Sequence, residues 1–384
     1  MYIRADDPVL IARRKTVEAY MRKMAGLIWR GERDMRYTTA NGIDPEEATG
    51  YARLEIKAGR LYRGLPYTHA GGSLTGFMDY FGPAEPSGVL PLQGLRLKPI
   101  CGTSSGTARL SSDCSGTVCL SWAQIGTSVN MVSTRHMVPD RGFSRVGDYE
   151  SDPADNTNSK ETVERNGTQR MFAAYGQLQT GDAVVCRGAN SGHVMMAVDP
   201  TVVYTPDGAI DGARSTLTVL EQTRQYFVEG EHWFDRTLGE EVWAWYGVDK
   251  VYTFDALFRE GYLPVTCREL IDPAPVEDMW VKDSETVFGK DTLCAGTVTS
   301  NRYLDSAVMT VTDETGAAVQ QGTLYAIRSS IRRIDLTRFR TEDPDLILGR
   351  IDPEALAPGK YRCTLTIRTV PGETVTLRDF EFKI

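Results

Sequence analysis

One cysteine of the chain has neighbours that suit a nucleophile. Cys114 lies in the sequence Asp-Cys-Ser-Gly at positions 113–116, and Ser112 or Asp113 can cap a helix that runs toward Ile125. The unpaired N–H groups at the start of a helix stabilise negative charge and favour the thiolate form of a cysteine placed there. The pattern therefore predicts nucleophilic catalysis by Cys114.

A thiolate nucleophile needs a base within hydrogen-bond reach, and the chain offers four histidines, which are His69, His136, His193 and His232. His193 follows Ser-Gly at 191–192 and opens the apolar segment 193–198, a pattern typical of a strand that would hold the ring rigidly at a sheet edge. His69 is a rival base without a strand around it. The other two histidines are interpreted as ordinary surface or core residues.

A third polar group should fix the orientation of the imidazole ring. Glu221 ends the strand predicted over 215–221 and is expected to take this role. Gln222 points to the opposite face and would serve if the register differs by one residue, so both remain open from the sequence. The seven cysteines form no Cys-x-x-Cys pair. We expect no metal and no organic cofactor.

The segments around these residues predict a mixed α+β fold. Apolar residues recur at three- and four-residue steps over 7–29, which indicates an amphipathic helix, and an acid followed by proline predicts a second helix over 45–61. The segment 71–112 is expected to form long loops, and the polar run 148–170 an exposed excursion. Three short strands follow as a meander, over 182–186, 193–198 and 215–221.

Beyond the proline-rich link at 272–275 the pattern changes to strands that alternate with turns. The strands are predicted over 292–298, 306–311, 360–367 and 374–384, which favours an all-β sandwich. Tyr361 stands two residues before Cys363, an arrangement that resembles the tyrosine corner of immunoglobulin-like domains. Cys294 is expected on the opposing sheet. A disulfide between Cys294 and Cys363 and a pair of buried thiols are both compatible with the sequence.

Several segments in order resemble the NlpC/P60 cell-wall peptidases. Residues 113–118 resemble the nucleophile motif of that family, and residues 64–73 resemble its Tyr-x-x-Gly-Gly segment. Residues 177–194 are similar to the Gly-Asp strand and the His-Val pair that bring in the base. Residues 218–223 look like the third-residue strand of the related CHAP amidases. The resemblance covers roughly 62–223. It departs from the family in the forty residues between Gly72 and Asp113, where about ten are usual, and in His69, where tryptophan is usual.

The resemblance implies a papain-like α+β core followed by an immunoglobulin-like sandwich. The expected parts are an N-terminal helical segment over 1–61, the hydrolase domain over 62–271 and the sandwich over 276–384. It further implies a triad of Cys114, His193 and Glu221, with Tyr67 beside the thiol and with Asp113 and Ser115 meeting the substrate amine. The reaction would hydrolyse amide bonds in bacterial peptidoglycan stem peptides through an acyl-enzyme. The alternative is an amidase-fold protein without useful turnover that binds at a cell surface.

The composition limits the partners. A formal net charge of -8 and a pI near 5.3, with no Lys/Arg-rich run, argue against nucleic acid as a ligand. No stretch of about 18 uninterrupted apolar residues is present, so we expect no membrane span. The first residues lack the pattern of a signal peptide, whereas the family resemblance implies an extracellular or cell-envelope location. The sequence does not indicate an oligomeric state.

Overall fold

The computed structural model describes residues 6–38, 53–67, 72–92, 112–139, 141–189, 191–223, 232–326, 331–341 and 347–384. They group into two compact units. Unit 1 comprises Met1–Ile28, Leu61–Tyr67 and Asp113–Glu277, and unit 2 comprises Trp29–Arg60, Thr68–Ser112 and Asp278–Ile384. The fold is mixed α+β, with N-terminal helices, several antiparallel sheets and all-β sheets at the C-terminal end. The domain bounds predicted from the sequence stay predictions.

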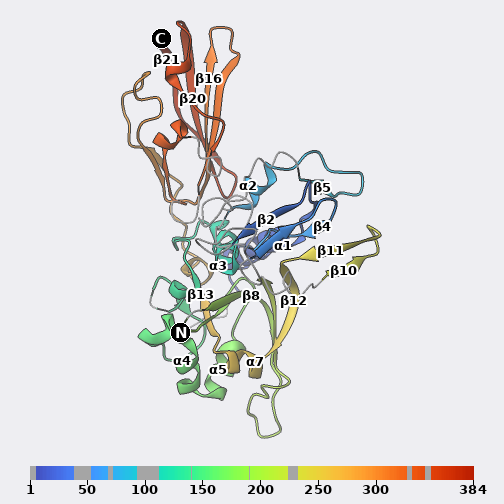
Figure 1. Cartoon of the computed structure of the whole chain (residues 1–384). Helices are drawn as coiled ribbons and strands as arrows, with labels where there is room; N and C mark the ends of the chain where they lie inside the picture. The colour runs from blue at the N-terminus through green and yellow to red at the C-terminus, as the bar shows by residue number, and fades with distance from the viewer. Residues whose placement is uncertain are drawn as a thin grey trace. The chain divides into compact units, whose positions relative to one another are not determined.

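The main sheet of unit 1 has the strand order β12-β9-β8-β7-β13-β6 (Figure 1). Strands β7, β8 and β9 form the predicted meander, since β7 pairs with β8 and β8 pairs with β9, both antiparallel. The α+β order inferred for this part is confirmed. The strands are β6 Ser144–Arg145, β7 Ala183–Arg187, β8 Gly192–Thr201, β9 Thr216–Gln222, β12 Tyr246–Thr253 and β13 Leu263–Thr266.

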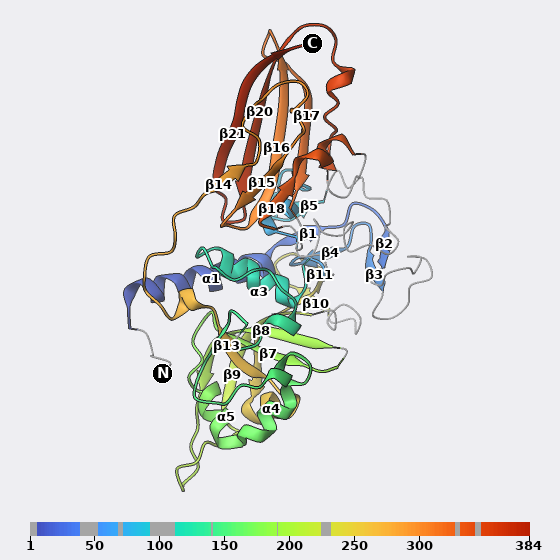
Figure 2. The same ribbon diagram turned by 90° about the vertical axis from the view of Figure 1, so that its left-hand side faces the viewer.

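Helices lie above and below this sheet in Figure 2, with α1 and α3 on one side and α4 and α5 on the other. The bounds are α1 Pro8–Gly26, α3 Cys114–Ala123, α4 Ser159–Asn166, α5 Thr168–Tyr175 and α7 Phe254–Glu260, with short 3-10 turns η2 Thr134–His136, η3 Pro153–Asn156 and η4 Arg268–Leu270. The helix predicted over 7–29 is confirmed. Its buried Arg14 donates to Asp182 at 2.9 Å and to the carbonyl oxygen of Leu270 at 2.8 Å, which fixes α1 to the rest of unit 1.

The polar run 148–170 is not the exposed excursion that its composition suggests. It folds into η3, α4 and the start of α5, and the side chains of Thr162 and Val163 are fully buried. The polar groups are satisfied locally, because the Thr162 hydroxyl donates to Asp155 and the Asp152 carboxylate accepts from the backbone N–H of Ala154 at 2.7 Å. Capping of this kind stabilises short helices whose composition alone reads as a loop.

The helix predicted over 45–61 is wrong where the structure describes that segment; residues 45–52 lie outside the described part. Strand β3 occupies Arg53–Ile56 and pairs with β2, Met35–Thr38, while β4 occupies Leu61–Arg63 and pairs with β11, Glu240–Ala244. Gly59 turns the chain between the two strands at a φ of 74°, a conformation that interrupts any helix. Strand partners remote in sequence thus override the local pattern.

Each unit contains further short elements. In unit 1, β10 His232–Asp235 forms an antiparallel hairpin with β11. In unit 2, Trp29 and Arg30 of β1, Ile28–Arg30, pair in parallel with β5, Leu90–Pro91, and α2 spans Leu74–Met78. The loop predicted over 71–112 therefore contains a helix and a strand, and residues 93–111 lie outside the described part.

The C-terminal part of unit 2 consists of two sheets, ordered β14-β15-β18 and β19-β17-β16-β20-β21. The strands predicted over 306–311, 360–367 and 374–384 are confirmed. The strand predicted over 292–298 begins only at Thr297, because Thr292 to Ala295 form a turn. The bounds are β14 Val281–Asp283, β15 Thr297–Ser300, β16 Leu304–Asp313, β17 Ala318–Tyr325, β18 Arg333–Asp335, β19 Ile347–Leu348, β20 Lys360–Thr369 and β21 Thr374–Lys383, with turns η6 Leu336–Arg340 and η7 Pro353–Ala355.

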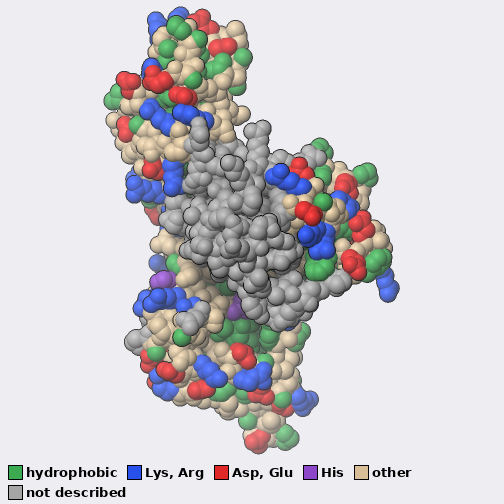
Figure 3. Space-filling model, viewed as in Figure 1, with side chains coloured by type: hydrophobic (Ala, Val, Ile, Leu, Met, Phe, Trp, Pro, Cys, Tyr) green, Lys and Arg blue, Asp and Glu red, His purple; other side chains and the backbone are tan. Residues whose placement is uncertain are grey.

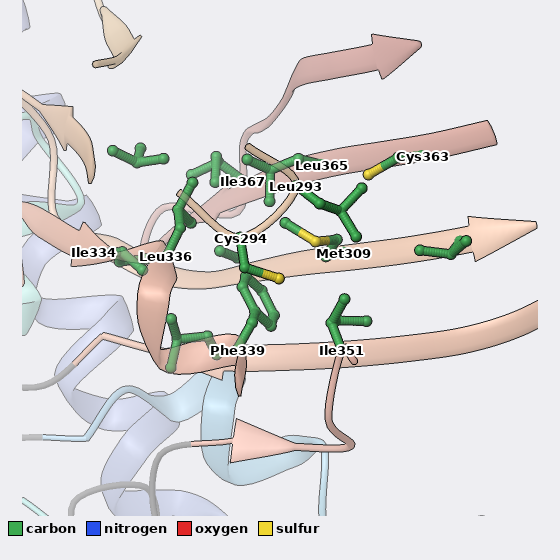
Figure 4. Packing of buried hydrophobic residues seen from close by; sticks show 14 of the residues in the cluster. Leu293, Cys294, Met309, Ile334, Leu336, Phe339, Ile351, Cys363, Leu365 and Ile367 are labelled. Carbon is green, nitrogen blue, oxygen red and sulfur yellow. The ribbon is translucent and has the colours of Figure 1, made fainter. Parts of the chain in front are cut away.

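The core of these sheets is apolar and contains two cysteines. Figure 4 shows Cys294 and Cys363 among leucine, isoleucine and phenylalanine side chains, and both are buried free thiols. Of the two alternatives left open by the sequence, the structure has the pair of thiols. Cys294 lies in the turn before β15 and not within a strand. The Tyr361 hydroxyl donates to the carbonyl oxygen of Ala357 at 2.8 Å, four residues earlier in the chain.

The surface carries charges of both signs. Lysine and arginine are interspersed with aspartate and glutamate over the described atoms visible in Figure 3. None of the helices in the described part of the chain combines the length and the apolar character that crossing a membrane requires.

Candidate active site

Cys114 occupies the first position of α3, as the sequence predicts. The carboxylate of Asp113 caps the helix, because its Oδ1 accepts from the backbone N–H of Gly116 at 2.6 Å. The carbonyl oxygen of Asp113 accepts from the hydroxyl of Thr117 at 2.9 Å. The cap fixes where the helix begins, and the first N–H groups of a helix have no acceptor within it. The side chain of Cys114 is therefore at the positive end of the helix dipole.

His193 is held at the start of β8 by its neighbours on both sides. A Cβ atom on Gly192 would lie 2.4 Å from Oγ1 of Thr134 and 3.0 Å from the carbonyl oxygen of Cys186, so only glycine allows η2 and β7 to approach here. The residues that follow, Val194 to Ala197, are fully buried and anchor the strand. The backbone at His193 is thus fixed by a close approach on one side and a packed strand on the other.

Glu221 meets the ring. Its Oε2 lies 2.7 Å from Nε2 of His193, and the carboxylate side chain is only 2% exposed. This leaves Nδ1 as the ring nitrogen for the thiol of Cys114. Burial lowers the pKa of His193, but its hydrogen bonds with Cys114 and with Glu221 raise it more, so the pKa stands well above the usual value. The arrangement favours an imidazolium beside the sulfur.

Gln222, the alternative third residue, makes different contacts. It lies on the other face of β9 and is fully buried. Its Oε1 accepts from the hydroxyl of Thr117 on α3, and its Nε2 donates to the carbonyl oxygens of Leu65 at 2.9 Å and Pro66 at 3.2 Å. Gln222 thus connects α3 to the segment that leads to Tyr67, and it does not touch His193.

Tyr67 reaches the sulfur in spite of the long segment that separates it from Cys114 in the sequence. Its hydroxyl lies 3.8 Å from Sγ of Cys114, close enough for a hydrogen bond to sulfur. The chain before it is held by Gln222 and by Gly64, whose φ of 80° and close approach to the ring of Tyr246 exclude a side chain. The structure brings Tyr67, Cys114, His193 and Glu221 into one cluster of unit 1.

Asp113 and Ser115 lie beside the cluster but face each other. The hydroxyl of Ser115 donates to Oδ1 of Asp113 at 2.9 Å, and both side chains are buried. The same oxygen of Asp113 also accepts the capping hydrogen bond from the backbone N–H of Gly116. Contact of these two residues with a substrate amine stays a prediction.

The remaining candidates are elsewhere or undescribed. His69 lies outside the described residues, and the side chain of His232 is not described either. His136 is in η2, with its Nδ1 3.4 Å from Oγ of Ser133. Cys119 and Cys267 are buried, as is Trp245, which stacks on Tyr62 with ring centroids 5.2 Å apart. Among the described residues no cluster of three or more His, Cys, Asp or Glu side chains could hold a metal ion.

Two residues of β12 that the sequence did not single out also contact the cluster. The hydroxyl of Tyr252 donates to Oε1 of Glu221 at 3.0 Å, and Nζ of Lys250 lies 3.2 Å from the same oxygen. No local motif marks them, because their contact with Glu221 depends on how β12 pairs with β9. Alternation along a neighbouring strand was the one available signal, and it requires the register to be known.

Comparisons with known proteins give little. No family model and no curated protein matches the chain. Among solved structures, CopC from Methylosinus trichosporium OB3b is similar over 23% of this chain and 72% of its own, with 17% identity and a TM-score of 0.16. A tetra-tandem repeat from the extending region of a large adhesion protein is similar over 53% of this chain and 41% of its own, with 14% identity and a TM-score of 0.19. At these TM-scores neither likeness bears on the fold or the function.

Proposed function

We propose that this chain is a cysteine hydrolase that cleaves amide bonds through an acyl-enzyme. The observation that carries the proposal is the cluster at the start of α3, where the Cys114 sulfur lies 3.8 Å from the Tyr67 hydroxyl and the His193 ring is held by Glu221 at 2.7 Å. A thiol at a helix start, beside an imidazole oriented by a carboxylate, is the arrangement that nucleophilic catalysis by cysteine requires.

The order of these residues and the motifs around them resemble the NlpC/P60 and CHAP amidases. The proposal therefore includes a papain-like core in unit 1 and an immunoglobulin-like sandwich formed by β14 to β21. The backbone contact of Tyr361 with Ala357 supports the second assignment.

The first half-reaction forms a thioester. The thiolate of Cys114 attacks the carbonyl carbon, and the electron pair of the carbonyl moves to the oxygen. In this mechanism the backbone N–H of Cys114 and the hydroxyl of Tyr67 stabilise that oxyanion. As the C–N bond breaks, His193 transfers its Nδ1 proton to the leaving amine, while Glu221 keeps the ring in place.

The second half-reaction returns the enzyme. Neutral His193 takes a proton from a water molecule that attacks the thioester carbonyl, the C–S bond breaks, and the carboxylic acid product leaves. The proton goes back to the Cys114–His193 pair. No step needs a metal or an organic cofactor.

The substrate class rests on the family resemblance, which implies the stem peptides of bacterial peptidoglycan. The test is digestion of purified muropeptides, followed by mass spectrometry of the products and of the amines released. Cys114→Ala should abolish release, and Cys119→Ala, which removes a buried thiol from the same helix, should retain it. Equal release by Cys114→Ala and the unsubstituted chain would exclude the mechanism. No release by any variant, with slow alkylation of Cys114, would favour a binding protein without turnover.

A further inference from the structure

The carboxylate of Glu221 is held from two sides. Oε2 contacts the Nε2 atom of His193 at 2.7 Å, and Oε1 contacts the hydroxyl of Tyr252 at 3.0 Å and Nζ of Lys250 at 3.2 Å. A buried carboxylate needs such partners, because loss of hydration is compensated only by hydrogen bonds and opposite charge. Each oxygen therefore has its own set of partners, and the carboxylate cannot rotate without breaking one set.

A bulge in β12 places Lys250 next to Glu221. Gly247 pairs with Glu221, but the next paired residue is Lys250, opposite Val219, so two residues of β12 face one of β9. Without the extra residue, Asp249 would lie opposite Val219, on the face of the sheet that carries Glu221. The bulge thus replaces an acid by a cation next to Glu221.

The extruded residue is itself held in place. Asp249 has a φ of 54°, unusual for a residue other than glycine. Its carboxylate pairs with the guanidinium of Arg22 on α1, at 2.7 Å and 3.1 Å. Contact with α1 therefore stabilises the bulge, and through it the position of Lys250.

We propose that Lys250 and Tyr252 are positioning residues, which hold Oε1 of Glu221 so that Oε2 faces His193, and that the charge of Lys250 limits how strongly Glu221 stabilises the imidazolium. This inference rests on the proposed function, since it describes the base of that reaction. Within the described part of the chain, further ionisable groups that interact with the cluster include Cys114 from α3, Cys186 from β7, Tyr67 after β4 and Tyr262 before β13.

The charge of Lys250 predicts the direction in which the titration midpoint of His193 changes when this charge is removed. A cation on the far side of the carboxylate repels the imidazolium, so its removal should raise the titration midpoint of His193 by about one pH unit. Tyr252 carries no charge at neutral pH. Its loss should change the orientation of Glu221 more than the midpoint, and it should slow alkylation of Cys114 several-fold.

The measurement is the titration of the His193 ring by NMR in the full chain with labelled histidine, with the signal assigned from a His193→Gln variant. Lys250→Met should raise the midpoint, and Lys250→Arg, which keeps the charge, should not. Lys160→Met on α4 and Tyr204→Phe are controls, since both side chains are largely exposed and neither belongs to the cluster. Rates of Cys114 alkylation by iodoacetamide, followed by mass spectrometry, complete the set.

An unchanged or lowered midpoint in Lys250→Met would overturn the role of its charge, as would a Lys250→Arg variant that behaves like Lys250→Met. An unchanged alkylation rate in Tyr252→Phe would overturn the role of the hydroxyl. The proposed function fails separately: Cys114→Ala should lower the midpoint of His193, and a midpoint indifferent to this substitution would show that the two residues form no pair.

Discussion

The side-chain amide of Gln222 donates a hydrogen bond of 2.9 Å to the carbonyl oxygen of Leu65, and by this contact β9 fixes the segment that carries Tyr67. The same side chain accepts a hydrogen bond from Thr117 on α3. One buried amide thus connects the helix of the thiol, the strand of the carboxylate and the chain before the tyrosine. The side chain of Glu221, one residue earlier in β9, contacts His193 instead.

This relationship predicts the effect of replacing the amide. Gln222→Glu keeps the shape but gives a carboxylate that cannot donate to the carbonyl oxygens of Leu65 and Pro66. We expect a loss of about 1–3 kcal/mol in the free energy of unfolding, the cost of leaving buried polar groups unpaired. Chemical denaturation followed by tryptophan fluorescence measures it.

The control for this substitution is Gln177→Glu, at an exposed position in unit 1. It should change the stability by less than about 0.5 kcal/mol. An equal loss in both variants would contradict the role assigned to Gln222.

The stability of the protein should depend on pH through His193. Its pKa in the folded chain is raised well above the ordinary 6.5, because hydrogen bonds with Cys114 and Glu221 outweigh burial, which lowers it. The folded chain therefore binds the His193 proton more tightly than the unfolded chain does. The stabilisation is complete below about pH 6.5 and is lost as the pH rises through the raised value.

The measurement is the free energy of unfolding of the unsubstituted chain minus that of His193→Gln, across the pH range in which both fold. The difference should decline toward high pH. A difference that grows with rising pH would mean that the ring is held neutral and not as an imidazolium.

The parts of the site that follow from short local patterns could be predicted. Asp113 before a helical segment predicts the cap, and therefore the place of Cys114 at the helix start. An apolar run directly after Gly192 predicts the strand that fixes His193. Both depend on residues adjacent in the chain, so the sequence contains the whole signal.

The rest depends on contacts between distant segments. Lys250 faces Glu221 only because Asp249 is bulged out toward Arg22, and no pattern within β12 reveals that contact. The segment before β4 has an acid and a proline that favour a helix, yet pairing of β3 with β2 prevails over that preference where the structure describes it. The choice between Glu221 and Gln222 likewise required the register of β9.

The two cysteines of the C-terminal sheets should behave as thiols. Cys294 and Cys363 are buried and free, and burial raises the pKa of both, to about 12 for Cys363. A thiol with a raised pKa forms little thiolate and reacts slowly. We expect the unfolding midpoint to be the same with and without dithiothreitol. A midpoint lowered by the reductant would indicate a disulfide.

A buried arginine should contribute strongly to the stability of unit 2. The side chain of Arg378 is fully buried, and its guanidinium pairs with Asp283 at 2.6 Å and 3.0 Å. It also donates to three carbonyl oxygens in the turn before β15, those of Thr292, Leu293 and Ala295 at 2.7–2.9 Å. Arg378→Met would leave the carboxylate of Asp283 buried without its cation, at a cost of about 3–5 kcal/mol.

The matched comparison is Arg362→Met on β20. Arg362 also forms a two-point ion pair, with Asp379 at 2.6 Å and 2.7 Å, but these side chains are 58% and 43% exposed. Water replaces such a partner readily, so the loss should be below about 1 kcal/mol. Thermal and chemical unfolding of both variants measures the difference. Similar losses for the two would contradict the strong contribution assigned to the buried contacts of Arg378.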